Sequence, residues 1–245
     1  MTIRRAMVLA AGLGLRMRPL SETRPKPLIE VSGRPLIDHA LDHLAAVGVE
    51  VAVVNVHWLG EQIVAHLADR RRPRIVISRE PELLETGGGI VKALPDLGAE
   101  PFFVINSDML WLDGTTPALE RLARAWRDAD MDALLLLHRT VAAVGYDGVG
   151  DYFADPLGKL TRRRPGEVAP HVYAGVQVLH PRLLVGAPAG AFSLNRCFDR
   201  AEEAGRLFGL MHDGLWFHVG TPADLATTQR HLDELKLFAV AEPTD

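Results

Sequence analysis

The sequence predicts an α/β fold, with a mixed, mostly parallel central sheet and helices on both of its faces. The first observation is that apolar, strand-like runs alternate with amphipathic helical patterns over the first 140 residues, which is typical of β-α-β units in a doubly covered sheet. The second is size and composition, since the chain has 245 residues, of which 48% are hydrophobic and 24% charged. These values are ordinary for a soluble globular protein with a substantial core.

The elements follow in chain order. Strands are expected at 6–11, 49–55, 74–78, 102–106 and 133–138, with helices between them at 35–47, 58–70, 88–97 and 116–129. After residue 140 come a segment rich in glycine, aspartate and aromatic residues at 144–159 and a charged turn at 162–167. The second half is then expected to complete the sheet with strands at 173–179 and 216–219 and to cover the pocket. Its helices are expected at 194–204 and 222–237. We expect one domain over 1–240, with halves at about 1–140 and 141–235, and a loose tail from 238 that ends with 241–245.

Charge and cysteine content exclude several classes of protein. The 27 lysines and arginines against 31 aspartates and glutamates give a net charge of −4, so no overall basic field favours nucleic acid. The single cysteine, Cys197, can form no intrachain disulfide, which fits a reducing cytosol. The first apolar run has only about seven residues before Gly12, too few to span a membrane. These features predict a cytoplasmic protein with no nucleic-acid or membrane partner. As a separate expectation, the protein is a monomer or homodimer whose partners are small-molecule substrates.

A glycine-rich turn follows the first predicted strand and indicates an anion site. Its sequence is AAGLG (10–14), and such small residues let backbone N–H groups approach phosphate oxygens. Arg16 and Lys26 follow as cations, and the prolines on both sides of Lys26 are expected to hold it in extended geometry. Neither the dinucleotide fingerprint nor the P-loop pattern matches this turn. For the turn taken alone, a solvated basic loop is the alternative.

Two later segments supply further candidate ligands. The segment ETGGG (85–89) stands directly before a predicted helix, where glycine N–H groups and open space suit a flat ligand. Its alternative is a helix cap with a hinge. Asp108 follows the apolar strand that ends at Asn106, a position suited to hold Mg²⁺ against phosphates. Its structural alternative is to cap a turn or a helix.

The ordered set of motifs resembles the sugar-1-phosphate nucleotidyltransferases. It comprises G-x-G-x-R at 12–16, P-L at 19–20, P-K-P at 25–27 and G-R-P-L at 33–36, and the resemblance extends to about residue 235. It implies a Rossmann-like α/β/α sandwich of the nucleotidyltransferase (GT-A-like) type. It also implies that a sugar 1-phosphate reacts with an NTP to give an NDP-sugar and pyrophosphate, with nucleotide bound by the first half and sugar by the second.

The resemblance implies a role for each matching residue. Catalytic roles fall to the groups expected to meet the phosphates, namely Arg16, Lys26 and Asp108. Nucleotide contacts are expected from the two glycine segments, namely Ala10, Ala11, Gly12, Gly14, Arg16, Glu85, Gly87 and Gly88. Sugar contacts are expected from Thr86, Asn106, Tyr173, Gly175 and Lys159, although a solvated lysine explains Lys159 equally well.

A late segment departs from the family pattern. The segment GLWFHVGTPADL (214–225) resembles W-x-D-x-G-T-P, whose aspartate is usually the second metal ligand, but His218 occupies that position. Mg²⁺ prefers oxygen ligands, whereas imidazole suits softer ions. We expect Asp108 to hold Mg²⁺, with Mn²⁺ as the alternative ion. His218 is expected to lie on one strand face with Trp216 and either to contact the metal, its water or a phosphate, or to be structural.

The substrate is indicated by resemblance alone. The segments LETGGGI (84–90), FSLNRCFDRAEEAGRLFGL (192–210) and WFHVGTPADL (216–225) most resemble family members that uridylylate N-acetylmuramate 1-phosphate in cell-wall recycling. Guanylyl, thymidylyl or uridylyl transfer to another hexose or heptose 1-phosphate stays open, as does a non-catalytic nucleotide-sugar-binding protein. Asn55 and His57 end a further strand, where a site role and a core role are both open.

Overall fold

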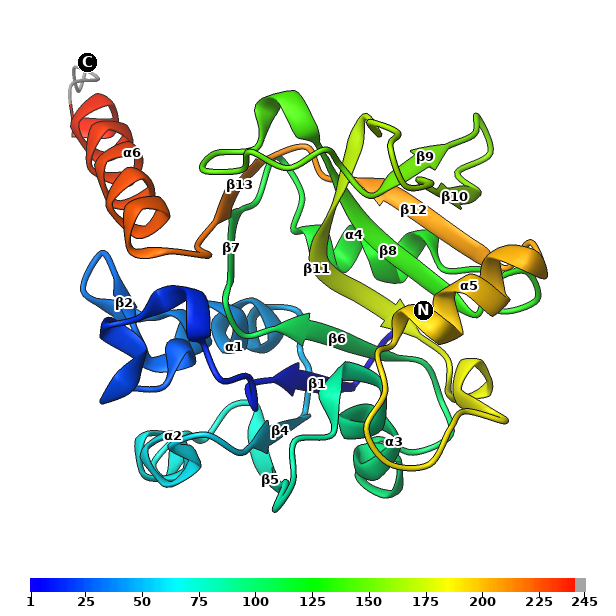
Figure 1. The fold of residues 1–245 in the computed structure, drawn as a ribbon, viewed down its shortest axis with the longest axis horizontal. Coiled ribbons are helices and arrows are strands. Elements are labelled where there is room, and N and C mark those ends of the chain that lie inside the picture. Colours follow the sequence, from blue (N-terminus) through cyan, green and yellow to red (C-terminus); the bar gives the residue numbers. More distant parts are fainter. Residues whose placement is uncertain (241–245) are drawn as a thin grey trace.

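The computed structural model describes residues 1–240, and a nine-stranded sheet forms the centre of this part of the chain (Figure 1). Seven strands lie side by side in the order β10-β9-β11-β6-β1-β4-β5, while β8 pairs with β11 and with β12. Their bounds are β1 (Arg5–Leu9), β4 (Val51–Val56), β5 (Arg74–Arg79), β6 (Phe102–Asn106), β8 (Ala133–Arg139), β9 (Tyr152–Ala154), β10 (Leu160–Arg162), β11 (His171–Leu179) and β12 (Leu207–Met211).

Strand direction confirms the predicted mixed, mostly parallel sheet. β1 runs parallel to β4 on one side and to β6 on the other, and β4 runs parallel to β5. β11 is antiparallel to β6 and β8, and β12 is parallel to β8. The order of connection therefore reverses beside β1, and ligands of open α/β sheets bind beyond the carboxyl ends of the strands at such a point.

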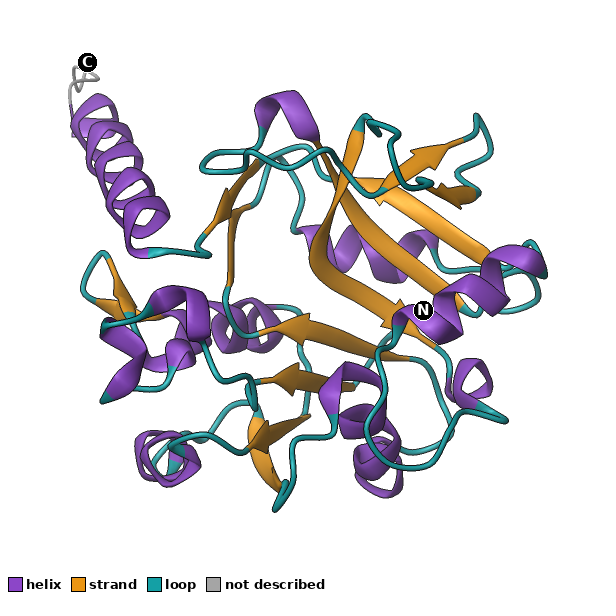
Figure 2. Ribbon diagram, viewed as in Figure 1, coloured by secondary structure: helices purple, strands orange, loops and turns teal. Residues whose placement is uncertain are grey.

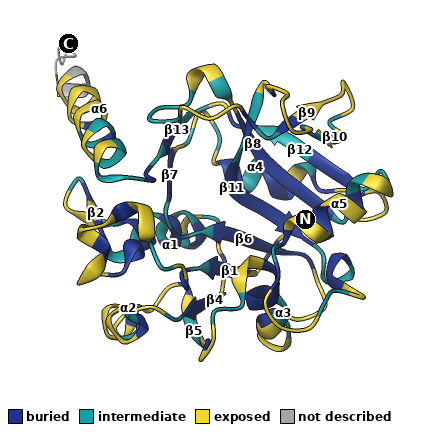
Figure 3. Cartoon of the chain, viewed as in Figure 1, coloured by how far each residue is buried: buried dark blue, intermediate teal, exposed yellow. Residues whose placement is uncertain are grey.

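Helices cover both faces of the sheet (Figure 2). The α-helices are α1 (Leu36–Ala46), α2 (Gly60–Leu67), α3 (Glu85–Leu97), α4 (Ala118–Ala125), α5 (Asn195–Glu203) and α6 (Pro222–Val240). Short 3₁₀ turns are η1 (Leu15–Met17), η2 (Leu20–Glu22), η3 (Lys26–Leu28), η4 (Thr140–Ala142) and η5 (Pro181–Leu184). Figure 3 shows the central strands β6, β8 and β11 mostly dark blue, hence buried, and the outer faces of most helices exposed, whereas β5 and β9 at the sheet edges are largely half-buried or exposed.

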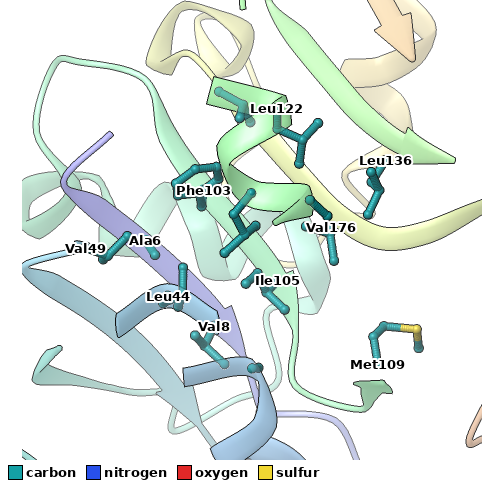
Figure 4. Packing of buried hydrophobic residues seen from close by; sticks show 14 of the residues in the cluster. Ala6, Val8, Leu44, Val49, Phe103, Ile105, Met109, Leu122, Leu136 and Val176 are labelled. Carbon is teal, nitrogen blue, oxygen red and sulfur yellow. The ribbon is translucent and has the colours of Figure 1, made fainter. Parts of the chain in front are cut away.

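Alternating strand residues build two separate core layers. In β1, Ala6 and Val8 join one hydrophobic cluster while Met7 between them joins the other, because successive side chains of a strand point to opposite faces. The first cluster contains residues of α1, α2 and α4, and the second contains residues of α3 and α5. Figure 4 shows the packing of the first cluster, including Val8, Leu44, Phe103, Ile105, Leu122 and Val176.

Several predicted elements differ from the structure. The predicted strand 216–219 is β13 (Leu215–His218), which does not complete the central sheet but pairs with β7 (Met109–Leu112) in a small antiparallel sheet. Six strands were not predicted, namely β7, β9, β10, β12 and the short β2 (Glu30–Val31) and β3 (Arg34–Pro35). Helix α6 continues to Val240, beyond the expected start of a tail at 238, and the expected tail 241–245 lies outside the described residues. Within residues 1–240, no helix is both long enough and apolar enough to cross a bilayer.

Candidate active site

A cavity of about 650 Å³ opens beyond the carboxyl ends of β1, β4 and β6. Its walls come from the segments 9–16, 26–27, 83–86 (without Leu84) and 106–108, and from the single residues Asn55, Ser193 and Gly220. Ten of the predicted site residues line it together, namely Ala10, Ala11, Gly12, Gly14, Arg16, Lys26, Glu85, Thr86, Asn106 and Asp108. The cavity thus lies where ligands of open α/β sheets bind, at the strand ends beside β1 where the order of connection reverses.

The two glycines of the first loop, Gly12 and Gly14, have different structural roles. Gly14 has φ +63°, and a Cβ atom there would lie 3.1 Å from Cβ of Ser21 and 3.2 Å from Cβ of Lys26. Both the backbone conformation and the packing therefore favour glycine at this position. At Gly12, by contrast, a Cβ atom would have no protein neighbour within 4 Å, so this glycine leaves open space at the cavity wall.

An ion pair joins Lys26 to Asp108 at the cavity. Lys26 Nζ lies 2.6 Å from Asp108 Oδ2, and the two side chains are 10% and 28% exposed. The prediction of an extended backbone at Lys26 was wrong, because Lys26 begins the 3₁₀ turn η3 after an extended Pro25. The turn, with Pro27 near its start, delivers the ammonium group to the carboxylate.

The carboxylate of Asp108 suits a divalent cation shared with phosphates. Among residues 1–240 there is no cluster of three or more histidine, cysteine, aspartate or glutamate side chains that could enclose a metal. Mg²⁺ rarely needs such a cage, because it is commonly bound by one or two carboxylates together with substrate phosphates and water. The donor set therefore fits Mg²⁺ held chiefly by Asp108.

His218 does not line the cavity, but it lies close to Asp108 in the structure. On β13 it pairs with Met109, the residue after Asp108, and its ring centroid is 6.0 Å from that of Trp216. Burial lowers the pKa of His218, Asp224 opposes this, and the nearby charges of Arg16 and Lys26 lower it further. The imidazole is thus neutral near pH 7 and keeps a lone pair. Its metal-proximal role stays a prediction.

The second glycine segment is helical and packed, which corrects two predictions. Helix α3 begins at Glu85, so the glycines lie within its first turns instead of before it. Gly87 and Gly88 do not line the cavity; their N–H groups donate to the carbonyl of Phe192 at 2.9 and 3.4 Å. A Cβ atom on Gly87 would lie 2.2 Å from the Phe192 ring. In this structure the two glycines admit the 190–193 loop, whereas Glu85 and Thr86 face the cavity.

The residues predicted to bind sugar are spread over different places. Tyr173 is half-buried against the second hydrophobic cluster, donates from its hydroxyl to Gln177 at 2.5 Å and does not line the cavity. Burial raises its pKa well above the usual value. Gly175 has φ +74°, and a Cβ atom there would lie 3.1 Å from Nδ2 of Asn106. Lys159 is placed elsewhere, in a separate hollow of about 540 Å³ formed with Arg127, Arg206 and Phe208 among others. The structure therefore separates Lys159 from the predicted phosphate ligands.

Some residues of the site were missed from the sequence. Ser193 lines the cavity from an irregular loop, and nothing in its local pattern marks it. Glu80 is only 3% exposed and accepts hydrogen bonds from Asn55 and from the backbone of Leu84. Glu80 directly follows β5, an edge strand that is mostly half-buried, so no local pattern marks the burial of this carboxylate. Asn55 both lines the cavity and takes part in this buried network, while His57 lies with Nδ1 2.8 Å from the carbonyl of Glu80.

Two known uridylyltransferases are similar to this chain over most of its length. The chain is 47% identical over 231 residues to N-acetylmuramate alpha-1-phosphate uridylyltransferase of Caulobacter vibrioides, covering 92% of this chain and 96% of that protein. It is 36% identical over 229 residues to the protein of the same name from Neisseria meningitidis, with coverage of 92% and 96%.

Solved structures share the fold at low identity. A UDP-glucose pyrophosphorylase complexed with UDP-glucose superimposes with a TM-score of 0.76 at 16% identity, covering 95% of this chain and 99% of that one. The inositol-1-phosphate CTP transferase from T. maritima gives 0.72 at 19% identity, with coverage of 94% and 97%. These structures confirm the predicted fold class, and the relatives confirm the resemblance seen in the sequence. The MobA-like NTP transferase domain matches residues 6–209, and the chain belongs to this family.

Proposed function

We propose that this protein transfers a nucleotidyl group from an NTP to a sugar 1-phosphate and releases pyrophosphate. The observation that carries the proposal is a single cavity in which the glycine loop, Arg16 and the Lys26–Asp108 pair meet. Backbone N–H groups of small residues, two cations and a metal-binding carboxylate are what two polyanionic substrates require.

The reaction needs positioning and charge stabilisation more than proton transfer. A phosphate oxygen of the sugar 1-phosphate attacks the α-phosphorus of the NTP, and the bond from that phosphorus to the bridging oxygen of pyrophosphate breaks. The second pKa of a phosphate monoester is about 6, so the nucleophile is largely ionised near pH 7. No general base is then required. Arg16 and Lys26 hold the phosphates in line and stabilise negative charge on the leaving group.

Asp108 would hold the divalent cation, which we propose is Mg²⁺ with Mn²⁺ as the alternative. When bound, the cation neutralises phosphate charge and acts as a Lewis acid. Lys26 supports this arrangement because it holds the Asp108 carboxylate at the cavity before substrates arrive. His218 lies next to this group, and the charges of Asp108 and Lys26 act on its imidazole.

We infer N-acetylmuramate 1-phosphate and UTP as the substrates. The support is the similarity to two proteins named for that activity, at 47% and 36% identity over most of both chains. The product, UDP-N-acetylmuramate, would belong to cell-wall recycling in the cytoplasm. Transfer of another nucleotide to another hexose or heptose 1-phosphate is the alternative, since relatives named mannose-1-phosphate guanylyltransferase match at 28% identity.

A substrate matrix tests this proposal directly. Purified protein is incubated with each of UTP, dTTP, GTP, CTP and ATP against N-acetylmuramate, N-acetylglucosamine, glucose and mannose 1-phosphates, with Mg²⁺ or Mn²⁺. Pyrophosphate release is measured, and the nucleotide sugar is identified by mass spectrometry. We expect the highest kcat/KM for UTP with N-acetylmuramate 1-phosphate. Absence of pyrophosphate release with every pair would contradict the nucleotidyltransferase activity, and a different best pair would correct only the substrates.

A further inference from the structure

A buried hydrogen-bonded chain links two walls of the cavity through Asn55 and Glu80. Asn55 Oδ1 accepts from the backbone N–H of Ala10 at 2.7 Å, and Asn55 Nδ2 donates to Glu80 Oε1 at 2.7 Å. Glu80 Oε2 in turn accepts from the backbone N–H of Leu84 at 3.0 Å. The two side-chain residues are 2% and 3% exposed. Buried hydrogen bonds of this kind are costly to leave incomplete.

The ends of this hydrogen-bonded chain lie in two segments that both contribute to the cavity wall. Ala10 belongs to the glycine loop after β1, and Leu84 precedes Glu85, where helix α3 begins. Glu85 lines the cavity with φ +57°, a left-handed conformation that costs about 1–3 kcal/mol in a residue other than glycine. The bond to Leu84 anchors the backbone directly before this strained residue.

Room for the chain is provided by the third glycine of the ETGGG segment. A Cβ atom on Gly89 would lie 2.7 Å from Glu80 Oε1 and 2.9 Å from Asn55 Nδ2. The absence of a side chain at Gly89 therefore allows the Asn55–Glu80 bond to pass beneath α3. The amide orientation of Asn55 is also fixed, because the carboxylate of Glu80 only accepts, so Nδ2 must face it and Oδ1 must face Ala10.

We propose that Asn55 and Glu80 form a positioning clamp for the NTP. The clamp holds the glycine loop and the 83–86 segment at a fixed separation, so the nucleotide enters a preformed site. Neither residue reacts; both act through the backbone that they hold. This inference rests on the proposed function for its kinetic readout. A preorganised site loses less conformational freedom on binding. Loss of the clamp is therefore expected to raise the KM for the NTP more than it lowers kcat.

The clamp is tested by exchanging the amide of Asn55 and the carboxylate of Glu80 between the two positions, which reverses the direction of the hydrogen bond between them. In Glu80→Gln, whichever way the new amide turns, one NH₂ group faces another donor, either Asn55 Nδ2 or the N–H of Leu84. In Asn55→Asp, two carboxylates face each other in a buried place. In the double variant, the new carboxylate at position 55 accepts from Ala10 and from the new amide at position 80, whose oxygen accepts from Leu84. All three hydrogen bonds and the single negative charge are thereby restored.

We expect each single variant to weaken NTP binding and the double variant to restore it. Each single variant raises the KM for the NTP about tenfold, as loss of one buried hydrogen bond predicts, while the KM for the sugar phosphate stays within about twofold. The double variant returns the KM for the NTP to within about threefold of the parent protein. Thr140→Val is the matched control, since it removes a hydrogen bond to the carbonyl of Ala169 away from the cavity, and we expect it to leave both KM values unchanged.

Amide hydrogen exchange at Ala10 and Leu84 measures the clamp without substrate. Exchange at both amides accelerates in each single variant and returns to the parent rate in the double variant. This readout separates the two proposals, because it does not depend on pyrophosphate release. If the double variant is no better than the single variants in exchange or in the KM for the NTP, or if the single variants are less stable but bind NTP normally, the clamp is refuted.

Discussion

Lys26 and Asp108, which are 82 positions apart in the chain, meet with Nζ 2.6 Å from Oδ2 at the edge of the cavity. One follows the glycine loop after β1 and the other follows β6, the strand paired with β1. Parallel neighbours end at the same edge of a sheet, so the fold brings their following loops together. The pair is only partly exposed, and this strengthens the interaction relative to a surface ion pair.

Removal of either partner is predicted to disable turnover without unfolding the protein. Lys26→Ala and Asp108→Asn should each lower kcat about 10²- to 10³-fold, since preorganised charge at a phosphoryl centre is worth that much. Pyrophosphate release gives the rate, and circular dichroism with thermal unfolding reports the fold. Arg18→Ala is the matched control, because Arg18 is an exposed cation of the same segment that does not line the cavity. Near-normal rates in either site variant would overturn the assignment.

Gly12 and Gly87 offer a pair of glycine substitutions with opposite expected effects. Gly12→Ala adds a methyl group where no protein atom lies within 4 Å, so stability should change by less than about 0.5 kcal/mol. The methyl group projects toward the cavity, and we expect the KM for the NTP to rise several-fold. Gly87→Ala brings a Cβ atom to 2.2 Å from the Phe192 ring, and overpacking of this kind typically costs about 1–3 kcal/mol. Urea unfolding and steady-state kinetics distinguish the two; an equal loss of stability in both variants would contradict this difference.

His218→Asp is predicted to keep turnover supported by Mg²⁺. An oxygen ligand suits this hard ion better than imidazole does, and at this position the charges of Arg16 and Lys26 act against those of Asp224 and Asp108. Rates with Mg²⁺ and with Mn²⁺ are compared in both proteins, and we expect the preference for Mg²⁺ to increase in the variant. A soluble, folded variant with no activity in either metal would count against a metal-proximal role of this position.

Sequence reasoning located the parallel strands and the first loop because these depend on local patterns. The strand 102–106 and the glycine turn 10–14 lie where they were expected. The errors concern contacts between segments far apart in the chain. Gly87 is packed against Phe192, and β13 pairs with β7, and neither partner is visible in local periodicity. Glu80 was missed for the same reason, because its burial depends on Asn55 and on the start of α3.

Lys159→Ala is predicted to leave catalysis unchanged. The side chain is exposed and belongs to the hollow beside Arg206 and Phe208, apart from the cavity that holds Lys26. The KM for the sugar 1-phosphate and kcat should therefore both stay within about twofold of the parent values. Lys26→Ala, assayed in parallel, shows that the measurement can detect a lost phosphate contact. A large rise in the KM of Lys159→Ala for the sugar phosphate would restore the role that the sequence suggested.

Acid is predicted to destabilise the protein through buried histidines, and His212 allows a direct test. Burial lowers the pKa of His212, and the neighbouring His138 lowers it further against opposing hydrogen bonds to backbone carbonyls. Nε2 lies 3.1 Å from the carbonyl of Leu112, whereas the buried Nδ1 has no partner among the described residues. Protonation would therefore place an N–H group where nothing accepts it.

The sign of the effect follows from proton linkage. The pKa of an unfolded histidine is about 6.5, and the folded value lies below it, so between the two the unfolded state binds more protons. The free energy of unfolding therefore falls as the pH drops from about 7.5 to 5.5. His212→Gln keeps a donor near the carbonyl of Leu112 and removes one titrating group, so its slope should be flatter, by at most about 1.4 kcal/mol per pH unit. Urea unfolding at several pH values measures both slopes. Equal slopes in the two proteins would show that His212 is not protonated on unfolding, contrary to its burial beside His138.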